Sequence, residues 1–306
     1  MIVNKIHYFR ILKILCVKTN LKATFALLGG LSFMSFAAIF IKAAEEAPGI
    51  ITAFYRMFIA SITLLPFFIV YLRKHRYHLP LKGILLAALS GLFFGIDMSL
   101  WSTGVVMSNA TIPTLMANLA PLWVGFGTLF ILKRRLRSGF WIGFLIALAG
   151  SVVLINRDFQ DSNNIVPGAL FGVGAGFFYG MFYLTSEPGR KLLDTLPFLF
   201  ISTFSSAVYL CIIALFLGYD FTGYSEKTYL LFLGIGLGVQ VCGWFLINYS
   251  QGFLPATTVS PTLLGQPVIT YLLAYIFLHE QLTAWHLTGG AIVVAGIYLV
   301  HYSRNR

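Results

Sequence analysis

The chain has 306 residues, of which 58% are hydrophobic and 10% are charged, and its formal net charge is +11. Soluble domains average roughly half apolar and a quarter charged residues, so this composition, with a mean hydropathy of +0.84, indicates a polytopic membrane protein. The charge does not indicate nucleic-acid binding, because the basic residues occupy short gaps between apolar runs.

Ten apolar stretches are long enough to cross a membrane as helices, which needs about 20 residues each. Helices are expected because an open sheet would leave backbone groups unpaired in lipid. A basic cytoplasmic segment, residues 1–23, precedes the first stretch, which we interpret as a retained span. The predicted spans are residues 24–43, 49–72, 83–105, 109–132, 139–156, 166–186, 195–217, 228–248, 256–279 and 283–302.

The chain contains an internal duplication. Residues 256–300 repeat the pattern of residues 110–154 at an offset of 146 residues, which superposes Pro121 on Pro267. An earlier part of each copy matches at an offset of 143. Each copy contains five predicted spans, and the copies are residues 24–156 and 166–302.

The distribution of Lys and Arg predicts the orientation of the spans. Placing both termini in the cytoplasm puts 17 of the 21 basic residues on that side. Because five spans is an odd number, the second copy must then enter the membrane from the opposite side. The predicted fold is therefore an all-α integral membrane protein of ten transmembrane helices, built as two inverted five-helix repeats. Such repeats place a binding site near the midplane, between the halves.

Several short segments resemble one known family. They are FIKAA at the end of the first span, AFYR with Arg56, Gln266-Pro267-Val268, and HEQLT at 279–283. In this order and spacing, the chain resembles the EamA-type transporters of the drug/metabolite transporter superfamily. The resemblance implies an inner-membrane carrier, usually an exporter of amino acids or other small metabolites. One departure is Arg134, where family members often carry Glu, so that acidic position survives only in the second copy.

Asp97 is the only carboxylate well inside a predicted span, where ionisable groups normally face a cavity or a partner. It matches Gln240 at the 143 offset, and four residues later Trp101 matches Trp244, with Asn248 extending the second face. We interpret the two faces as opposite walls of a central substrate cavity. Asp97 would bind a substrate ammonium or carry a coupling proton. The alternative is a structural Asp97 and two packing tryptophans.

Arg56 lies in the first turns of the second predicted span. It is a candidate for recognising an anionic group such as a carboxylate. We favour a structural role, in which it reaches the membrane interface or pairs with Glu45 or Glu46 outside.

The fourth and ninth spans combine proline with small polar residues. Pro121 and Pro267 each free a backbone carbonyl, which membrane depth tolerates only against protein or water, so broken helices that face a cavity are expected. Their symmetric placement favours gating over packing alone. Asn118 and Gln266 are further candidate substrate ligands, as is Tyr179, for which packing is the alternative.

These patterns favour secondary active transport by alternating access. The expected activity is export of a small metabolite such as an amino acid. The chain has no P-loop, so ATP is not the energy source, and neither a metal nor a cofactor is expected, since its three cysteines are widely spaced. A membrane-embedded lipid-modifying enzyme is one alternative, although HExxH and GxSxG motifs are absent. A channel is another. With fused halves, a monomer in the lipid bilayer should suffice.

Overall fold

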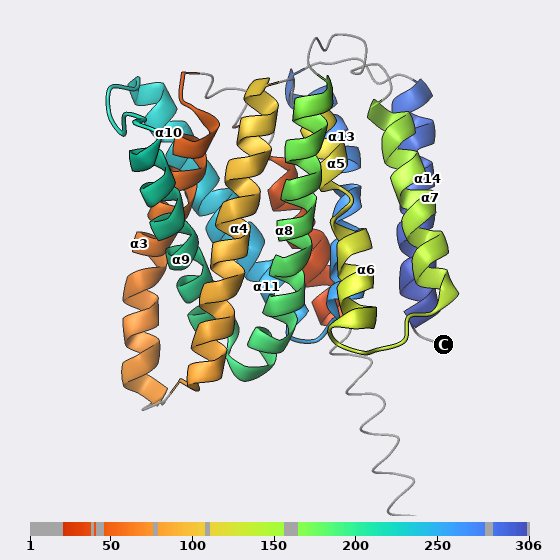
Figure 1. Cartoon of the computed structure of the whole chain (residues 1–306), viewed down its shortest axis with the longest axis horizontal. Coiled ribbons are helices and arrows are strands. Elements are labelled where there is room, and N and C mark those ends of the chain that lie inside the picture. Colours follow the sequence, from red (N-terminus) through yellow and green to blue (C-terminus); the bar gives the residue numbers. More distant parts are fainter. Residues whose placement is uncertain are drawn as a thin grey trace, which may run out of the picture.

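The computed structural model describes residues 21–37, 40, 46–75, 79–107, 111–155, 165–278 and 284–304. Within these ranges every regular element is a helix, and the helices form one bundle (Figure 1). The first is the N-terminal helix, Leu21–Ser35. The others are α3 (Gly49–His75), α4 (Leu81–Met107), α5 (Thr111–Ala117), α6 (Ala120–Phe130), α7 (Ser138–Ile155), α8 (Ile165–Leu192), α9 (Thr195–Phe216), α10 (Glu226–Gly234), η2 (Ile235–Gly243), α11 (Trp244–Gln251), α12 (Ala256–Thr262), η3 (Leu263–Gly265), α13 (Gln266–Leu278) and α14 (Ala284–Arg304).

The composition of these helices suits a membrane. Among the described residues, six helical segments are long and apolar enough to span one, and Leu21–Ser35 and Ser138–Val153 are shorter apolar helices. Large hydrophobic side chains cover the outside of the bundle, among them Phe67, Leu85 and Ile212. Extended apolar surface of this kind is stable in hydrocarbon and not in water. The described part of the chain is thus all-helical, and the protein is a multi-pass membrane protein.

The fourth and ninth predicted spans are both broken, as their prolines predicted. Asn118 and Leu119 form a turn between α5 and α6, and Pro121 follows in the first turn of α6. The tight helix η3 separates α12 from α13, and Pro267 is the second residue of α13. Proline suits the start of a helix because it lacks the N–H that would be unpaired there. The two breaks coincide at the offset of 146 residues.

The eighth predicted span is continuous but changes its winding. α10 passes directly into the π-helix η2, which passes into α11. Runs of π-helix are rare, and single-turn π-bulges are frequent at functional sites. Here the π-helical segment contains Gln240.

Helices α7 and α14 form an antiparallel pair at one side of the bundle (Figure 1). Their backbones approach closely at glycines: a Cβ on Gly143 would lie 2.7 Å from the carbonyl oxygen of Gly296, and one on Gly150 would lie 2.9 Å from that of Gly289. Small residues permit such contacts between membrane helices. At the offset of 146 residues, Gly143 matches Gly289 and Gly150 matches Gly296. The two contacts are therefore equivalent under the duplication.

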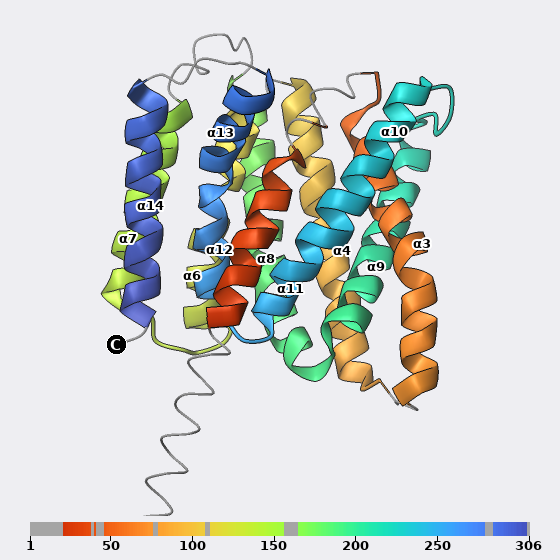
Figure 2. The ribbon, with the colours of Figure 1, turned by 180° about the vertical axis from the view of Figure 1, so that it is seen from behind.

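One end of the bundle, which we call the basic end, collects most described Lys and Arg residues. The N-terminal helix begins there and α14 ends there (Figure 2). The helix ends and connections there carry Lys22, Arg73, Lys74, Lys82, Lys133, Arg134, Arg135, Arg137, Arg190, Lys191 and Arg304.

Candidate functional site

Arg56 lies inside the bundle and not at its surface. Its side chain is 5% exposed, and its Nε donates a hydrogen bond to Oε1 of Gln240 at 2.9 Å. The guanidinium also lies over the ring of Phe94, 5.8 Å from the centroid, and contacts the sulfur of Met34 at 3.8 Å. A cation over an aromatic face is attracted by the ring quadrupole. Three other segments of the chain therefore contact this one charge.

We expected a structural Arg56 to reach the membrane interface or to pair with Glu45 or Glu46. Its burial contradicts the position at the interface. Glu46 instead accepts hydrogen bonds at Oε2 from the backbone N–H of Ser225 at 3.1 Å and from the hydroxyl of Thr228 at 3.0 Å. Arg56 lies about two turns after the start of α3, on a face that packs against η2 and not against solvent. The other suggested partner, Glu45, lies outside the described residues.

Asp97 on α4 supplies the opposite charge. It is 2% exposed and interacts electrostatically with Arg56 across the α3–α4 contact. Its Oδ2 is buried without a hydrogen-bond partner among the described residues. A buried acceptor left unpaired costs about 1–3 kcal/mol, and more when it is charged. An acid kept in this condition needs an explanation beyond packing.

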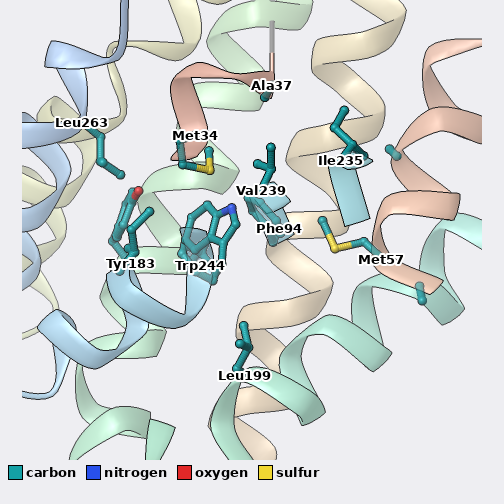
Figure 3. Close-up of a cluster of buried hydrophobic side chains, with 14 of the residues drawn as sticks. Met34, Ala37, Met57, Phe94, Tyr183, Leu199, Ile235, Val239, Trp244 and Leu263 are labelled. Atoms are coloured by element: carbon teal, nitrogen blue, oxygen red, sulfur yellow. The ribbon is translucent and has the colours of Figure 1, made fainter. Parts of the chain in front are cut away.

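Aromatic rings surround the charged pair. The indole of Trp244 is buried with its centroid 4.7 Å from that of Phe94 and 5.1 Å from that of Phe182 (Figure 3). Tyr179 lies beside it, interacts electrostatically with both Asp97 and Arg56, and accepts a hydrogen bond from the hydroxyl of Tyr183 at 2.7 Å. The site is thus polar at its centre and aromatic at its rim.

A small cavity adjoins these rings. Gln240, Trp244 and Asn248 line it from one face of the eighth predicted span, and Phe94 and Thr203 line it from α4 and α9. Its volume is about 10 Å³, which is roughly the room one water molecule needs. The site is therefore closed in this conformation.

Three of the residues that line the cavity carry unsatisfied polar atoms. Oγ1 of Thr203, Nε1 of Trp244 and Oδ1 of Asn248 are buried without a hydrogen-bond partner among the described residues. Asn248 uses only its Nδ2, which donates to the carbonyl of Trp244 at 2.8 Å. These atoms could each bond a polar ligand when the cavity widens.

The structure brings Arg56, Asp97, Tyr179, Gln240 and Trp244 into one cluster, with Asn248 at its edge. It does not bring Trp101 there, because the indole N–H of Trp101 donates to Oγ1 of Thr114 on α5 at 2.9 Å. The structure thus places Gln240, Trp244 and Asn248 of one predicted face at the small cavity, and Trp101 of the other face away from it. On the α4 side the small cavity is lined by Gly91 and Phe94, and neither Asp97 nor Trp101 lines it.

The remaining candidates lie at the helix breaks. Gln266 donates from Nε2 to the carbonyl of Met34 at 3.2 Å, which satisfies a carbonyl at the end of the N-terminal helix. Asn118 lies in the turn between α5 and α6, where its Nδ2 is buried without a partner in the described part of the chain. Pro121 and Pro267 begin the second halves of the two broken segments.

Sequence reasoning missed Phe94, Phe182 and Thr203 in the cavity, and Glu187 and Arg190 at the basic end. The aromatic residues gave no signal, because rings are common in this chain. Glu187 was placed just outside the sixth span, whereas α8 continues to Leu192 and buries it at 3% exposed. The four-residue spacing from Tyr179 through Tyr183 to Glu187 was the signal available.

Comparison with known proteins identifies relatives along almost the whole chain. The model of the EamA-like transporter family matches residues 21–156 and again residues 166–302. An S-adenosylmethionine uptake transporter of Rickettsia prowazekii (strain Madrid E) is 26% identical over 254 residues, which are 83% of each chain. The uncharacterized transporter YdfC of Bacillus subtilis (strain 168) is 23% identical over 83% of this chain and 82% of its own.

A third relative is the uncharacterized inner membrane transporter YhbE of Escherichia coli (strain K12), which is 29% identical over 178 residues, 56% of this chain and 53% of its own. A protein of known crystal structure has the same fold, with a TM-score of 0.76 at 16% sequence identity, over 92% of this chain and 97% of its own. Relatives named as transporters favour transport over the enzyme alternative.

Proposed function

The chain belongs to the EamA-like transporter family, and we propose that it is a secondary active transporter that moves a small metabolite by alternating access around Arg56 and Asp97. A small-molecule substrate and a multi-pass inner-membrane location agree with its relatives. The observation that carries the proposal is the buried carboxylate of Asp97, whose Oδ2 has no hydrogen-bond partner among the described residues.

The chemistry of the site suits an amino acid. Asp97 would bind the ammonium group and Arg56 the carboxylate, since a guanidinium matches a carboxylate with two parallel N–H donors. Trp244, Phe94 and Tyr179 would contact the apolar part. S-adenosylmethionine, which the Rickettsia relative takes up, also contains an amino-acid group, so the same two charges suit it. The family resemblance favours export, whereas the name of the Rickettsia relative favours uptake.

We also propose the ten-span arrangement of two inverted repeats, residues 24–156 and 166–302, with both termini in the cytoplasm. Three observations support it. The family model matches twice, the breaks at 118–119 and 263–265 are equivalent, and the glycine contacts of α7 and α14 exchange under the same offset. The basic end would face the cytoplasm, by the positive-inside rule.

The test measures the melting temperature of the purified protein with amino acids, S-adenosylmethionine, nucleosides, sugar phosphates and cationic drugs. A ligand at a hundred times its Kd stabilises by about 2.7 kcal/mol. We expect an amino-acid compound to raise the melting temperature of the wild type and of Asp220→Asn, an exposed control, but not of Asp97→Asn.

Counterflow of the same compound in proteoliposomes then establishes transport, whichever its direction in the cell. A compound that stabilises Asp97→Asn as well as the wild type would remove Asp97 from the substrate site. Stabilisation by no small metabolite in the panel would contradict the proposal as a whole.

A further inference from the structure

Glu187 is a buried carboxylate that joins three parts of the chain at the basic end. Its Oε1 accepts hydrogen bonds from Arg134 at 2.6 Å and from Lys191 at 3.1 Å. Its Oε2 accepts the backbone N–H of Ala256, the first residue of α12, at 2.9 Å. The carboxylate thus compensates one cation from the α6–α7 connection, and it caps the start of a helix from the second half.

The residues that Glu187 holds belong to the two broken segments. Arg134 follows the end of α6, after the first break, and Ala256 begins α12, before the second break. Helices α6 and α12 contact each other, and both contact α8. Glu187 on α8 therefore fastens one broken segment from each half to a single helix.

The backbone before Arg134 is also specialised. Lys133 has a φ of 51°, in the left-handed region that residues with side chains rarely adopt. The turn that it makes carries Arg134 to Glu187. A conformation of this kind persists only where the surrounding contacts hold it.

A polar stripe connects this junction with the central site. Tyr179, Tyr183 and Glu187 follow one another at four-residue spacing, which places them along one side of α8. Tyr179 interacts with Asp97 and Arg56, and Tyr183 bonds to Tyr179. Glu187 lies eight residues, or about 12 Å, further along the helix axis. The stripe thus leads from the buried charges to the basic end.

We propose that Glu187 is an ionic latch that closes the basic end of the transport path. While it holds Arg134 and Ala256, α6 and α12 stay together on α8 and cover Tyr183. When the latch opens, these two segments separate at their breaks and the path along the stripe reaches the solvent at that end. The inference rests on the proposed carrier function, and Glu187 acts by positioning the segments, not by binding substrate.

The test measures how fast a thiol reagent modifies a cysteine placed behind the latch. Ser260→Cys is suitable, because Ser260 is buried on α12 and, among the described residues, its hydroxyl bonds only to the carbonyl of Ala256 in the same helix. The native cysteines are first replaced by serine, and the protein is studied in nanodiscs without substrate. We expect Glu187→Gln and Arg134→Gln each to raise the modification rate about fivefold or more, and Arg134→Lys to restore most of the protection.

Two controls separate the latch from general loosening. Arg137→Gln removes a charge from the same connection, but Arg137 donates to the carbonyl of Ser303 and not to Glu187. Ser61→Cys is a matched reporter on α3, buried and bonded to the carbonyl four residues before it. Arg137→Gln should not change the modification rate of Ser260→Cys. Glu187→Gln and Arg134→Gln should not change the modification rate of Ser61→Cys.

Unchanged modification of Ser260→Cys in both latch variants would overturn the inference, and so would an equal increase in Arg137→Gln or at the Ser61→Cys reporter. If Glu187→Gln does not fold, Arg134→Gln decides alone, since its side chain is half exposed. Because the assay uses no substrate, a failed latch leaves the ligand test of the proposed function intact, and the reverse also holds.

Discussion

At the scale of single residues, the buried charges of Arg56 and Asp97 bear on both the proposed function and the stability of the protein. Each is buried, and each is the electrostatic partner of the other. Removing one of two interacting buried charges is destabilising, because it leaves the other charge without its electrostatic partner. Each buried charge is therefore unfavourable unless its electrostatic partner, or a ligand group in the partner's place, is present.

We accordingly expect Arg56→Met to destabilise the protein strongly, and Arg56→Met combined with Asp97→Asn to recover part of the loss. Melting temperatures of the wild type, both single variants and the double variant form the thermodynamic cycle. Simple addition of the two single effects would mean that the charges do not interact in the folded protein.

The sequence indicated Asp97 because a carboxylate inside an apolar run has few explanations. It did not reveal the burial of Arg56, because a position near the start of a span is compatible with the interface as well as with the core. Only the neighbouring helix decides, and here η2 brings Gln240 against the guanidinium. The role of Gln266 was equally hidden, since spacing does not show that its amide meets the backbone of Met34.

At the scale of elements, helix breaks and glycine contacts determine how the segments pack. Prolines predicted both breaks, because their effect on the backbone is local and independent of partners. The π-helix η2 had no such signal in the sequence. Its extra residue per turn is tolerated where tertiary contacts, such as that of Gly236 with Ile59 on α3, favour it.

The contact between α7 and α14 yields a stability prediction. A Cβ on Gly296 would clash with the backbone nitrogen of Ala147, so Gly296→Ala should lower the free energy of unfolding by about 1–3 kcal/mol. Gly238→Ala is the control, because a Cβ there would meet no described residue within 4 Å. Denaturation in detergent would measure both, and an equal effect of the two substitutions would show that the glycine contact is not what stabilises the pair.

At the scale of the whole molecule, two glutamates connect the predicted halves at opposite ends. Glu187 does so at the basic end, where it binds Arg134, and Glu46 connects the chain before α3 with the start of α10 at the other. Composition predicted the membrane class, and the lengths of the apolar stretches predicted where helices lie along the chain. Neither predicted these connections, because they depend on which helix ends meet in space.

The connection at Glu46 predicts a dependence on pH. Hydrogen bonds from the side chain and backbone of Ser225, and then from Thr228, lower the pKa of Glu46 below its ordinary value of 4.5. A depressed pKa in the folded state means that the stabilisation is present above that ordinary value and is lost as pH falls through the folded pKa. Between neutral pH and pH about 3, the melting temperature of the wild type should therefore fall more than that of Glu46→Gln.

Glu226→Gln is the matched control, because Glu226 is exposed one residue after Ser225 and should leave the acid sensitivity unchanged. Equal acid sensitivity of wild type and Glu46→Gln would assign the loss of stability to other carboxylates.

The closed cavity beside Trp244 also bears on proton leakage across a membrane that contains the proposed carrier. A space of about 10 Å³ admits no file of water molecules, and protons cross a dry barrier poorly without such a file. We therefore expect the proposed carrier to conduct no protons at this level of the bundle in the closed conformation. A carrier with this property can be abundant in an energised membrane without short-circuiting its voltage, and current should flow only when a substrate drives the cycle.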